Sequence, residues 1–272
     1  MSIIVSLTST ASRLEILRYT LISLTEQTHK PNSIIVNLSK EAYLMDKGVS
    51  ELPAWFSLFE DKGVQVNWVE NTGSYRKLLP RLSEASDDDV IVTCDDDVIY
   101  APHWLASLMK TADEFPNHIV CGRARKPSVN FLKKQQSYLH WSVVKPGSEG
   151  AQLVPIGIAG VVYRPALLDI DFILKKDFLE EAPKQDDLWF KVASRRKGTL
   201  VKVSDEAESA VFPIETKNSL SSSNAGGQYV SKWNNVLSSL AERVLVRIKA
   251  YLGFAVNGND KVWRHLTEKY FR

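Results

Sequence analysis

The amino-acid sequence predicts an α/β fold, in which a mixed but mainly parallel sheet is flanked by helices and followed by a helical C-terminal extension. The first observation is an apolar segment at 2–9, a helical pattern at 13–28 and a second apolar segment at 33–39. Two parallel strands joined by a helix are the unit from which parallel sheets are built. The second observation is that apolar and helical segments keep alternating as far as residue 205. The third is a largely helical pattern in the tail, over 229–272.

Taken in chain order, 2–9 is expected to be a buried strand that opens into a polar loop. The helix at 13–28 has leucines at helical spacing, and the strand at 33–39 is entered through Pro31. The helix predicted at 183–198 begins after Pro183 and stops at Gly198. The other predicted strands are 63–70, 89–94, 118–125, 153–165 and 199–205, and the other predicted helices are 74–85 and 102–115.

Two stretches interrupt this alternation. Residues 126–152 are polar and aromatic, which predicts a long loop or hairpin over one face. The Ser-, Asn- and Gly-rich segment 218–228 predicts a flexible boundary. The expected domains are therefore a catalytic domain over 1–217 and a helical extension over 218–272.

The composition is that of an ordinary globular protein, with 44% hydrophobic and 24% charged residues among 272. The formal charge of +2 is too small to predict a nucleic-acid partner. Cys94 and Cys121 have no metal-type spacing and suggest no disulfide framework. With no signal-peptide pattern and no run of ~20 apolar residues, we expect a cytoplasmic protein.

The segment "DDDVIVTCDDDVIYAPHW" places three aspartates, Asp95, Asp96 and Asp97, directly after an apolar strand. If strand geometry persists, Asp95 and Asp97 point one way and Asp96 the other. Two such charges ~4 Å apart repel by about a few kcal/mol, so a cation is expected to offset them. Hard carboxylate ligands at a strand end favour Mg²⁺ or Mn²⁺ with a bound diphosphate. A solvated acidic loop is the alternative, and for the earlier triplet Asp87–Asp89 a turn and helix cap is expected.

The segment "VTCDDDVIYAPHWL" resembles the DxD segment of GT-A-fold glycosyltransferases. The opening segment "IIVSLTSTASRLEILRYTLISLTEQTHKPNSIIVNLS" is similar to the nucleotide-binding half of that Rossmann-type fold, and "TGSYRKLLPRL", "GIAGVVYRP" and "QDDLWFKVASRRKG" follow in the expected order. The resemblance covers 2–205 and is closest to bacterial family-2-like transferases of surface polysaccharide synthesis. It implies a nucleoside diphosphate sugar as donor, Mg²⁺ or Mn²⁺ on its diphosphate, and a glycan or lipid-linked glycan as acceptor.

Carried over to this chain, the resemblance implies that Asp97 and Asp95 ligate the metal. Asp95 would also contact the ribose or base side of the donor, and Asp96 would assist or hold the loop. The other donor-side residues that it implies are Thr8, Ser9, Arg13 and Lys77, with Arg76 as a further candidate facing the diphosphate. Arg13 is equally well explained as an exposed helix-start residue, and Lys77 as part of a solvated helix face. The stretch "TSTASR" departs from relatives, which often have an aromatic residue and a proline there.

Sugar transfer also needs a base, because the acceptor hydroxyl has a pKa far above 7. In the resembling family an acidic pair at a late helix start supplies it, which here is Asp186 and Asp187. Aspartate is also favoured as a helix cap, and we assign that role to Asp186. Asp187 is then the candidate base. A single base beyond the anomeric carbon implies an inverting reaction.

The acceptor side is less clearly marked. Gly157 and Gly160 allow either close approach of a ligand or a strand bulge. Tyr138, His140 and Trp141 could contact a sugar, although core packing explains each equally well.

The tail has an apolar stripe with basic residues beside it, formed by Leu237, Leu240, Val244 and Ile248 with Lys232, Arg243, Arg247 and Lys249. This pattern is typical of peripheral contact with a membrane surface, here the inner face of the cytoplasmic membrane. Packing onto the catalytic domain is the favoured alternative.

Two other functions remain open from the sequence. A nucleotidyltransferase that makes sugar nucleotides would share the acidic metal site, but "SLTSTASRL" lacks the glycine-rich loop of such enzymes. A non-catalytic sugar-nucleotide-binding protein of the same fold is the other, and the two acidic clusters count against it. A glycosidase with two carboxylates fits the strand-end triplet less well than a metal and phosphate site does.

Overall fold

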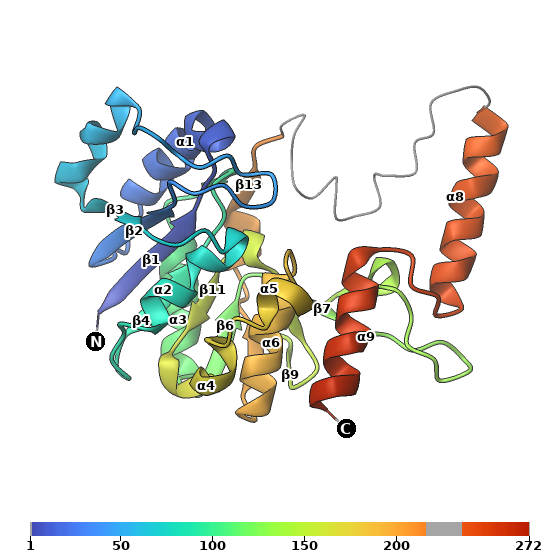
Figure 1. Ribbon diagram of the computed structural model, residues 1–272. Helices are drawn as coiled ribbons and strands as arrows, with labels where there is room; N and C mark the ends of the chain where they lie inside the picture. Colours follow the sequence, from blue (N-terminus) through green and yellow to red (C-terminus); the bar gives the residue numbers. More distant parts are fainter. Residues whose placement is uncertain (1, 216–235, 272) are drawn as a thin grey trace. The chain divides into compact units, whose positions relative to one another are not determined.

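The computed structural model describes residues 2–215 and 236–271 (Figure 1). The chain divides into two compact units. The first unit comprises Met1–Ala124 and Val144–Ile214, and the second comprises Arg125–Val143 and Glu215–Arg272. The segment 218–228, predicted to be a flexible boundary, lies outside the described residues.

The first unit is built on an eight-stranded sheet of order β3-β2-β1-β4-β11-β6-β12-β9. Its strands are β1 (Ile3–Thr8), β2 (Ser33–Leu38), β3 (Val64–Trp68), β4 (Val90–Thr93), β6 (His118–Cys121), β9 (Glu149–Gly150), β11 (Val161–Tyr163) and β12 (Leu200–Val203). Neighbours among β1 to β4 are parallel, as are β6 and β12, whereas β11 is antiparallel to β4 and β6, and β9 to β12. The prediction of a mixed, mainly parallel sheet is confirmed.

Helices flank this sheet (Figure 1). In the first unit they are α1 (Leu14–Thr25), α2 (Leu79–Leu82), α3 (Trp104–Glu114), α4 (Ile170–Ile173), α5 (Phe178–Glu181) and α6 (Asp186–Arg196). On α1 the predicted leucine stripe is buried: Leu17, Leu21 and Leu24 belong to the same core as Val5 of β1 and Val92 of β4. Three short strands complete the unit: β5 (Val98–Tyr100), β13 (Val211–Pro213), which pairs with β5, and β10 (Val154–Pro155).

Three predicted elements differ in the structure. The helix expected at 74–85 is a 3-10 helix, Gly73–Lys77, followed by the single turn of α2. The strand expected at 118–125 is divided into β6 and β7 (Ala124–Lys126). The strand expected at 153–165 is broken by a 3-10 helix, Gly157–Ala159. The following Gly160 has φ +86°, a backbone conformation that favours glycine. A Cβ at this position would lie 2.4 Å from the Trp104 ring, so no residue with a side chain fits there.

The second unit contains β7 residues paired antiparallel with β8 (Ser142–Val143), and the helices α8 (Val236–Tyr251) and α9 (Gly258–Tyr270). The helical tail is thus confirmed over its described part. Trp141 is buried and makes an edge-on contact with Trp263 of α9, with ring centroids 5.4 Å apart, so core packing is its role. Among the helices that the structure describes, none combines the length and apolar character needed to cross a bilayer.

Candidate active site

The predicted site residues lie at one edge of the sheet, where the parallel strands β1 and β4 end. Ser6 of β1 is opposite Thr93 of β4. All four residues of β4 are buried, so the polar residues that come next emerge at the sheet edge. The loop after β1 contains Ser9 and leads to Arg13, while the loop after β4 contains the three aspartates. The sheet therefore brings two distant parts of the sequence together.

Arg13 connects these two loops. Its Nη2 lies 2.6 Å from Asp96 Oδ1 and 2.8 Å from Asp97 Oδ2, and its Nε donates to Asp96 Oδ2 at 3.1 Å. The Ser9 hydroxyl donates to the same Asp96 oxygen at 2.5 Å. Arg13 is thus an ion-pair partner of the aspartates and not merely an exposed helix-start residue.

Burial governs the ionisation of this cluster. Asp96 is buried, which raises the pKa of its carboxyl to about 6 even though Arg13 and the Ser9 hydroxyl act in the opposite direction. For Arg13, burial acts to lower the pKa, but the charges of Asp96 and Asp97 outweigh it and the pKa is raised. The guanidinium therefore stays charged beside the aspartates.

A second cation, Lys77, connects the remaining carboxylates. Its Nζ lies 2.8 Å from Asp186 Oδ2, 3.3 Å from Asp95 Oδ1 and 4.0 Å from Asp187 Oδ1. The lysine is buried, so the solvated helix face considered from the sequence is wrong. Burial acts to lower the pKa of its ammonium, but Asp186, Asp95 and Asp187 together raise it well above the usual value. Lys77 thus joins the aspartate loop to the acidic start of α6.

Gly157 makes this arrangement possible. A Cβ at this position would lie 2.7 Å from Lys77 Nζ and 3.1 Å from Asp187 Oδ1. The backbone N–H of Gly157 donates to Asp187 Oδ2 at 3.1 Å. Only a residue without a side chain leaves room for the ammonium and the carboxylate together, and its N–H orients that carboxylate. The groups that approach Gly157 closely are therefore the Lys77 ammonium and the Asp187 carboxylate of the same chain.

The surroundings of Asp187 shift the pKa of its carboxyl towards neutral pH. Burial raises the pKa of its carboxyl to about 7; the charge of Lys77 lowers it, and those of Asp186 and Asp95 raise it. A carboxylate with a pKa near the working pH is well suited to accept a proton.

Asp186 lies in the first turn of α6, where an aspartate is favoured, but it is not the N-cap of the helix. The residue before α6 is Gln185, and no side chain caps the helix start. Asp186 instead accepts a hydrogen bond from the Ser74 hydroxyl at 2.9 Å, besides its ion pair with Lys77. The partners of its carboxylate are therefore an ammonium and a hydroxyl from another segment.

The expected alternation of the three aspartates is also wrong. Because β4 ends at Thr93, strand geometry does not persist through the triplet. Asp96 and Asp97 share Arg13, whereas Asp95 contacts Lys77. Within residues 2–215 and 236–271, no three His, Cys, Asp or Glu side chains are grouped to hold a metal. The partly exposed carboxylates of Asp95 and Asp97 nevertheless offer the hard oxygen ligands that suit Mg²⁺ or Mn²⁺ with a diphosphate.

The other predicted residue, Thr8, lies at the end of β1 and is half-buried, and its hydroxyl donates to the carbonyl of Asn37 at 2.8 Å. The sequence reasoning missed Asp46, whose Oδ2 accepts from buried Arg76 at 2.9 Å. Arg76 also donates to the carbonyl of Ser9 at 3.1 Å, so this pair holds the loop after β1. No pattern marks Asp46, since a lone aspartate in a loop is common.

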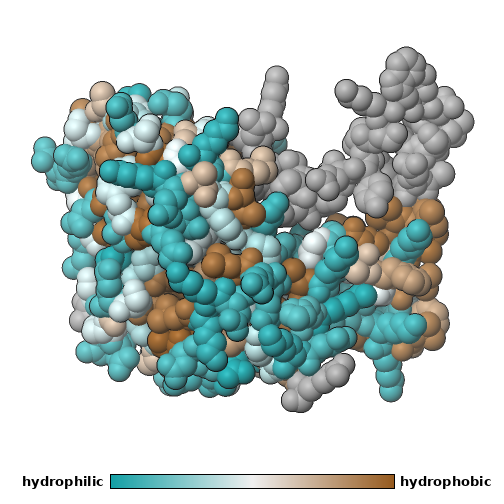
Figure 2. Space-filling model, viewed as in Figure 1, coloured by the Kyte–Doolittle hydropathy of each residue, from teal (hydrophilic) through white to brown (hydrophobic). Residues whose placement is uncertain are grey.

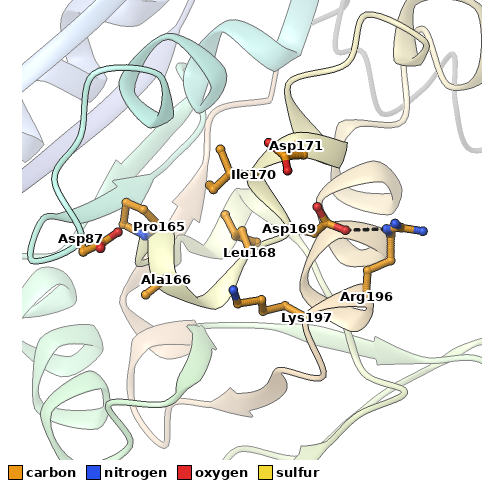
Figure 3. Close-up of a pocket in the computed structure, with 9 residues that line it drawn as sticks. All are labelled: Asp87, Pro165, Ala166, Leu168, Asp169, Ile170, Asp171, Arg196 and Lys197. Atoms are coloured by element: carbon orange, nitrogen blue, oxygen red, sulfur yellow. Dashed lines mark hydrogen bonds and ion pairs between the residues drawn. The ribbon is translucent and has the colours of Figure 1, made fainter.

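A surface pocket of about 540 Å³ lies elsewhere in the first unit (Figure 3). It is lined by Asp87, Pro165, Ala166, Leu168, Asp169, Ile170, Asp171, Arg196 and Lys197. Asp87 precedes β4, whereas Asp95 follows it, so the pocket is at the other end of that strand. Its Arg196 and Asp169 form an ion pair at 2.7 Å. The pocket is therefore separate from the aspartate cluster.

Comparison with known proteins agrees with the fold. A model of the family described as glycosyl transferase family 2 matches residues 3–175, more than half of the chain. The chain belongs to glycosyl transferase family 2. It is therefore a glycosyltransferase, as the aspartate segment predicted. The family match includes Arg13, Lys77 and the three aspartates, whereas Asp186 and Asp187 lie beyond it.

Solved structures with a similar fold include two of S. aureus TarS. That of TarS 1-349 has a TM-score of 0.52 and 16% identity, covering 100% of this chain and 91% of that one. That of TarS has a TM-score of 0.51 and 14% identity, covering 94% of this chain and 44% of that one. At such identities the likeness shows the GT-A fold alone.

A structure of S. aureus TarS 1-349 in complex with UDP covers 76% of this family 2 chain and 58% of its own, at 14% identity. Its TM-score is 0.49. Among curated proteins the comparison found no match.

Proposed function

We propose that this glycosyltransferase moves a sugar from a nucleoside diphosphate sugar to a glycan or lipid-linked glycan acceptor in the synthesis of a cell-surface polysaccharide. The observation that supports it best is the sharing of Lys77. Asp95 Oδ1 is 3.3 Å and Asp187 Oδ1 is 4.0 Å from the same Nζ, so the two oxygens are no more than 7.3 Å apart. A donor-side carboxylate and a base are then close enough to act on one sugar.

On the donor side, Asp97 and Asp95 are the proposed ligands of Mg²⁺ or Mn²⁺. When bound, the cation offsets the charge of the diphosphate leaving group. Asp96 holds the loop through Ser9 and Arg13, which fits its burial and its hydrogen bonds. The residues proposed to line the donor are Thr8, Ser9, Arg13, Lys77, Asp95 and Asp96.

On the acceptor side, Asp187 is the proposed general base. The acceptor oxygen attacks the anomeric carbon as its proton passes to Asp187, and the bond from that carbon to the diphosphate breaks. The nucleoside diphosphate leaves with the bonding electrons. Attack from the side opposite the leaving group inverts the anomeric configuration. The Gly157 N–H on Oδ2 leaves Oδ1 as the oxygen that accepts the proton.

We further propose residues 1–217 as the catalytic domain and 218–272 as its helical extension. The cytoplasm is the proposed compartment. Both cysteines, Cys94 and Cys121, are free thiols, which fits a reducing environment.

The test uses UDP-, GDP-, CMP- and dTDP-sugars, each with Mg²⁺, Mn²⁺ or EDTA. Thermal stability reports donor binding, because a ligand that binds only the folded state stabilises it. Release of free nucleotide reports turnover. We expect one nucleotide class to stabilise the protein only with metal. Release of pyrophosphate from a nucleoside triphosphate and a sugar phosphate would instead indicate a nucleotidyltransferase.

Two variants separate the roles. Asp97→Asn should lose the metal-dependent stabilisation by donor. Asp187→Asn should keep it but lose turnover by about 100-fold or more, the usual contribution of a general base. The matched control is Asp88→Asn, at an exposed aspartate in the turn before β4, which should change neither. Turnover by Asp187→Asn equal to that of the control would exclude the proposed base, and donor binding without turnover in the unaltered protein would favour a non-catalytic binding protein.

A further inference from the structure

The second unit exposes large apolar side chains around the end of α8. Leu245 and Ile248 are three residues apart and therefore lie on one side of α8, and Leu252 directly follows the helix; all three are exposed. Phe254, just beyond the helix, is 60% exposed. In Figure 2 hydrophobic colour gathers at the right of the view, over the described end of α8. A stable monomer rarely leaves such a group uncovered without a function.

A loop adds two more apolar residues to this region. Asn130 closes a tight turn by donating its N–H to the carbonyl of Lys134 at 2.8 Å, and the turn presents Phe131 and Leu132, 74% and 54% exposed. The loop is fastened to the helix end, because Asn130 Nδ2 donates to the Tyr251 carbonyl at 3.2 Å. We call Phe131, Leu132, Leu245, Ile248, Leu252 and Phe254 the apolar face.

Positive charge surrounds the apolar face. The second unit contains thirteen Lys and Arg against four Asp and Glu in the sequence, a formal charge of +9. The whole chain carries only +2, so the first unit carries −7. Lys133 and Lys134 adjoin Phe131 and Leu132, and Arg247 and Lys249 lie beside Ile248; all four are exposed. Of the four acidic residues, Asp260 is buried, and its carboxylate accepts hydrogen bonds from the backbone N–H groups of Tyr138 and Val256.

We propose that the apolar face docks on an anionic lipid surface, with Phe131 and Leu132 inserted among the lipids. Exposed apolar side chains beside lysines are what such a surface binds, since the chains enter the interface while the cations pair with headgroups. The same face of a second copy is a poorer partner, because it would bring two units of +9 together. Val244 and Ile248 of the stripe predicted from the sequence are exposed, while Leu237 and Leu240 lie outside the described side chains. The loop with Phe131 is an addition that the helical pattern did not indicate.

The experiment is co-sedimentation of the full chain with phosphatidylglycerol or phosphatidylcholine vesicles. We expect binding to the anionic vesicles only, and weaker binding as salt screens the charges. Phe131→Ser should weaken it by about tenfold, as expected for withdrawing one large apolar side chain from the interface. Lys133→Glu with Lys134→Glu should abolish it. The matched control is Leu58→Ser, which removes a 63% exposed leucine from the first unit and should bind like the unaltered protein.

Thermal unfolding of the Phe131→Ser variant checks that it folds, and nucleotide release checks that the proposed sugar transfer is intact. Both measurements should give the values of the unaltered protein. No binding of the unaltered protein to anionic vesicles would overturn the proposal, as would equal binding by Phe131→Ser and Leu58→Ser. A lipid-free dimer that Phe131→Ser dissociates would assign the apolar face to a second copy and also overturn it.

Discussion

If Asp187 is the base, the rate of sugar transfer plotted against pH should fall on the acidic side, with an apparent pKa of about 7 for this acidic limb. Burial, together with Asp186 and Asp95, raises the pKa of the Asp187 carboxyl above its usual range, against the opposing charge of Lys77. A base is active only when ionised, so activity is lost as pH falls through this value. One unit below it, only roughly a tenth of the carboxyl is ionised, and the rate should fall about tenfold from its plateau.

The Asp186→Asn variant tests the cause of this pKa. It removes a negative charge that raises the pKa of Asp187, and it frees Lys77 from a carboxylate 2.8 Å away. Both changes favour the ionised form of Asp187, so the acidic limb should move down by roughly one pH unit, the lower end of the range for a neighbouring charge. An asparagine oxygen can still accept the Ser74 hydrogen bond, which limits the structural change.

The assay is kcat/KM for nucleotide release over a pH range of roughly 5 to 9, at saturating metal. Asp88→Asn is the control, because it also removes a carboxylate, but one that does not contact Lys77. The acidic limb of its pH profile should coincide with that of the unaltered protein. A limb near pH 4 in the unaltered protein would refute the burial of the base. A limb that Asp186→Asn leaves in place would refute the electrostatic coupling.

Three further outcomes follow from the same site and core. Chelation of divalent metal by EDTA should abolish donor-dependent stabilisation in the unaltered protein but change nothing in Asp97→Asn, as measured by thermal unfolding. Gly157→Ala should lower kcat by about 10- to 100-fold, since its Cβ would lie 2.7 Å from Lys77 Nζ, whereas Gly150→Ala, with its closest atom at 3.4 Å, should not. Lys191→Met should stabilise the fold by at most about 3 kcal/mol below pH 8, because burial lowers the pKa of this lysine from 10.5 to about 8. Since the charged form is the costly one, this gain should shrink as pH rises from 8 towards 10.5, as measured by urea unfolding.

The sequence predicted the sheet and the place of the aspartates because both depend on local pattern. The run of apolar residues before Asp95 predicts a central strand that is buried on both faces. The polar residues that follow it are then expected at the end of that strand, at the edge of the sheet. The same reasoning could not say which cation each aspartate meets. Arg13 and Lys77 come from other segments, 83 residues before Asp96 and 18 before Asp95, and only the tertiary fold sets those distances.

Elements broken by packing were the ones predicted least well. The sequence from 153 to 165 favours a strand at every apolar position, and its two glycines only suggest an irregularity. What decides the break is the Trp104 ring beside Gly160 and the Lys77 ammonium beside Gly157. Both neighbours are more than fifty residues away in sequence, and they could not be found from a local pattern.

The charges of the two clusters explain why so many carboxylates tolerate one another. Arg13 forms ion pairs with Asp96 and Asp97, and Lys77 forms them with Asp95, Asp186 and Asp187. Two cations are thus paired with five carboxylates. With every group ionised, the site would hold a formal charge of −3. Two acids relieve part of that excess, because burial keeps the pKa of Asp96 at about 6 and that of Asp187 at about 7. Asp95 and Asp97 have partly exposed side chains, 33% and 18%. Their oxygens can therefore be reached by a divalent cation that offsets the rest of the negative charge, as proposed for the donor side.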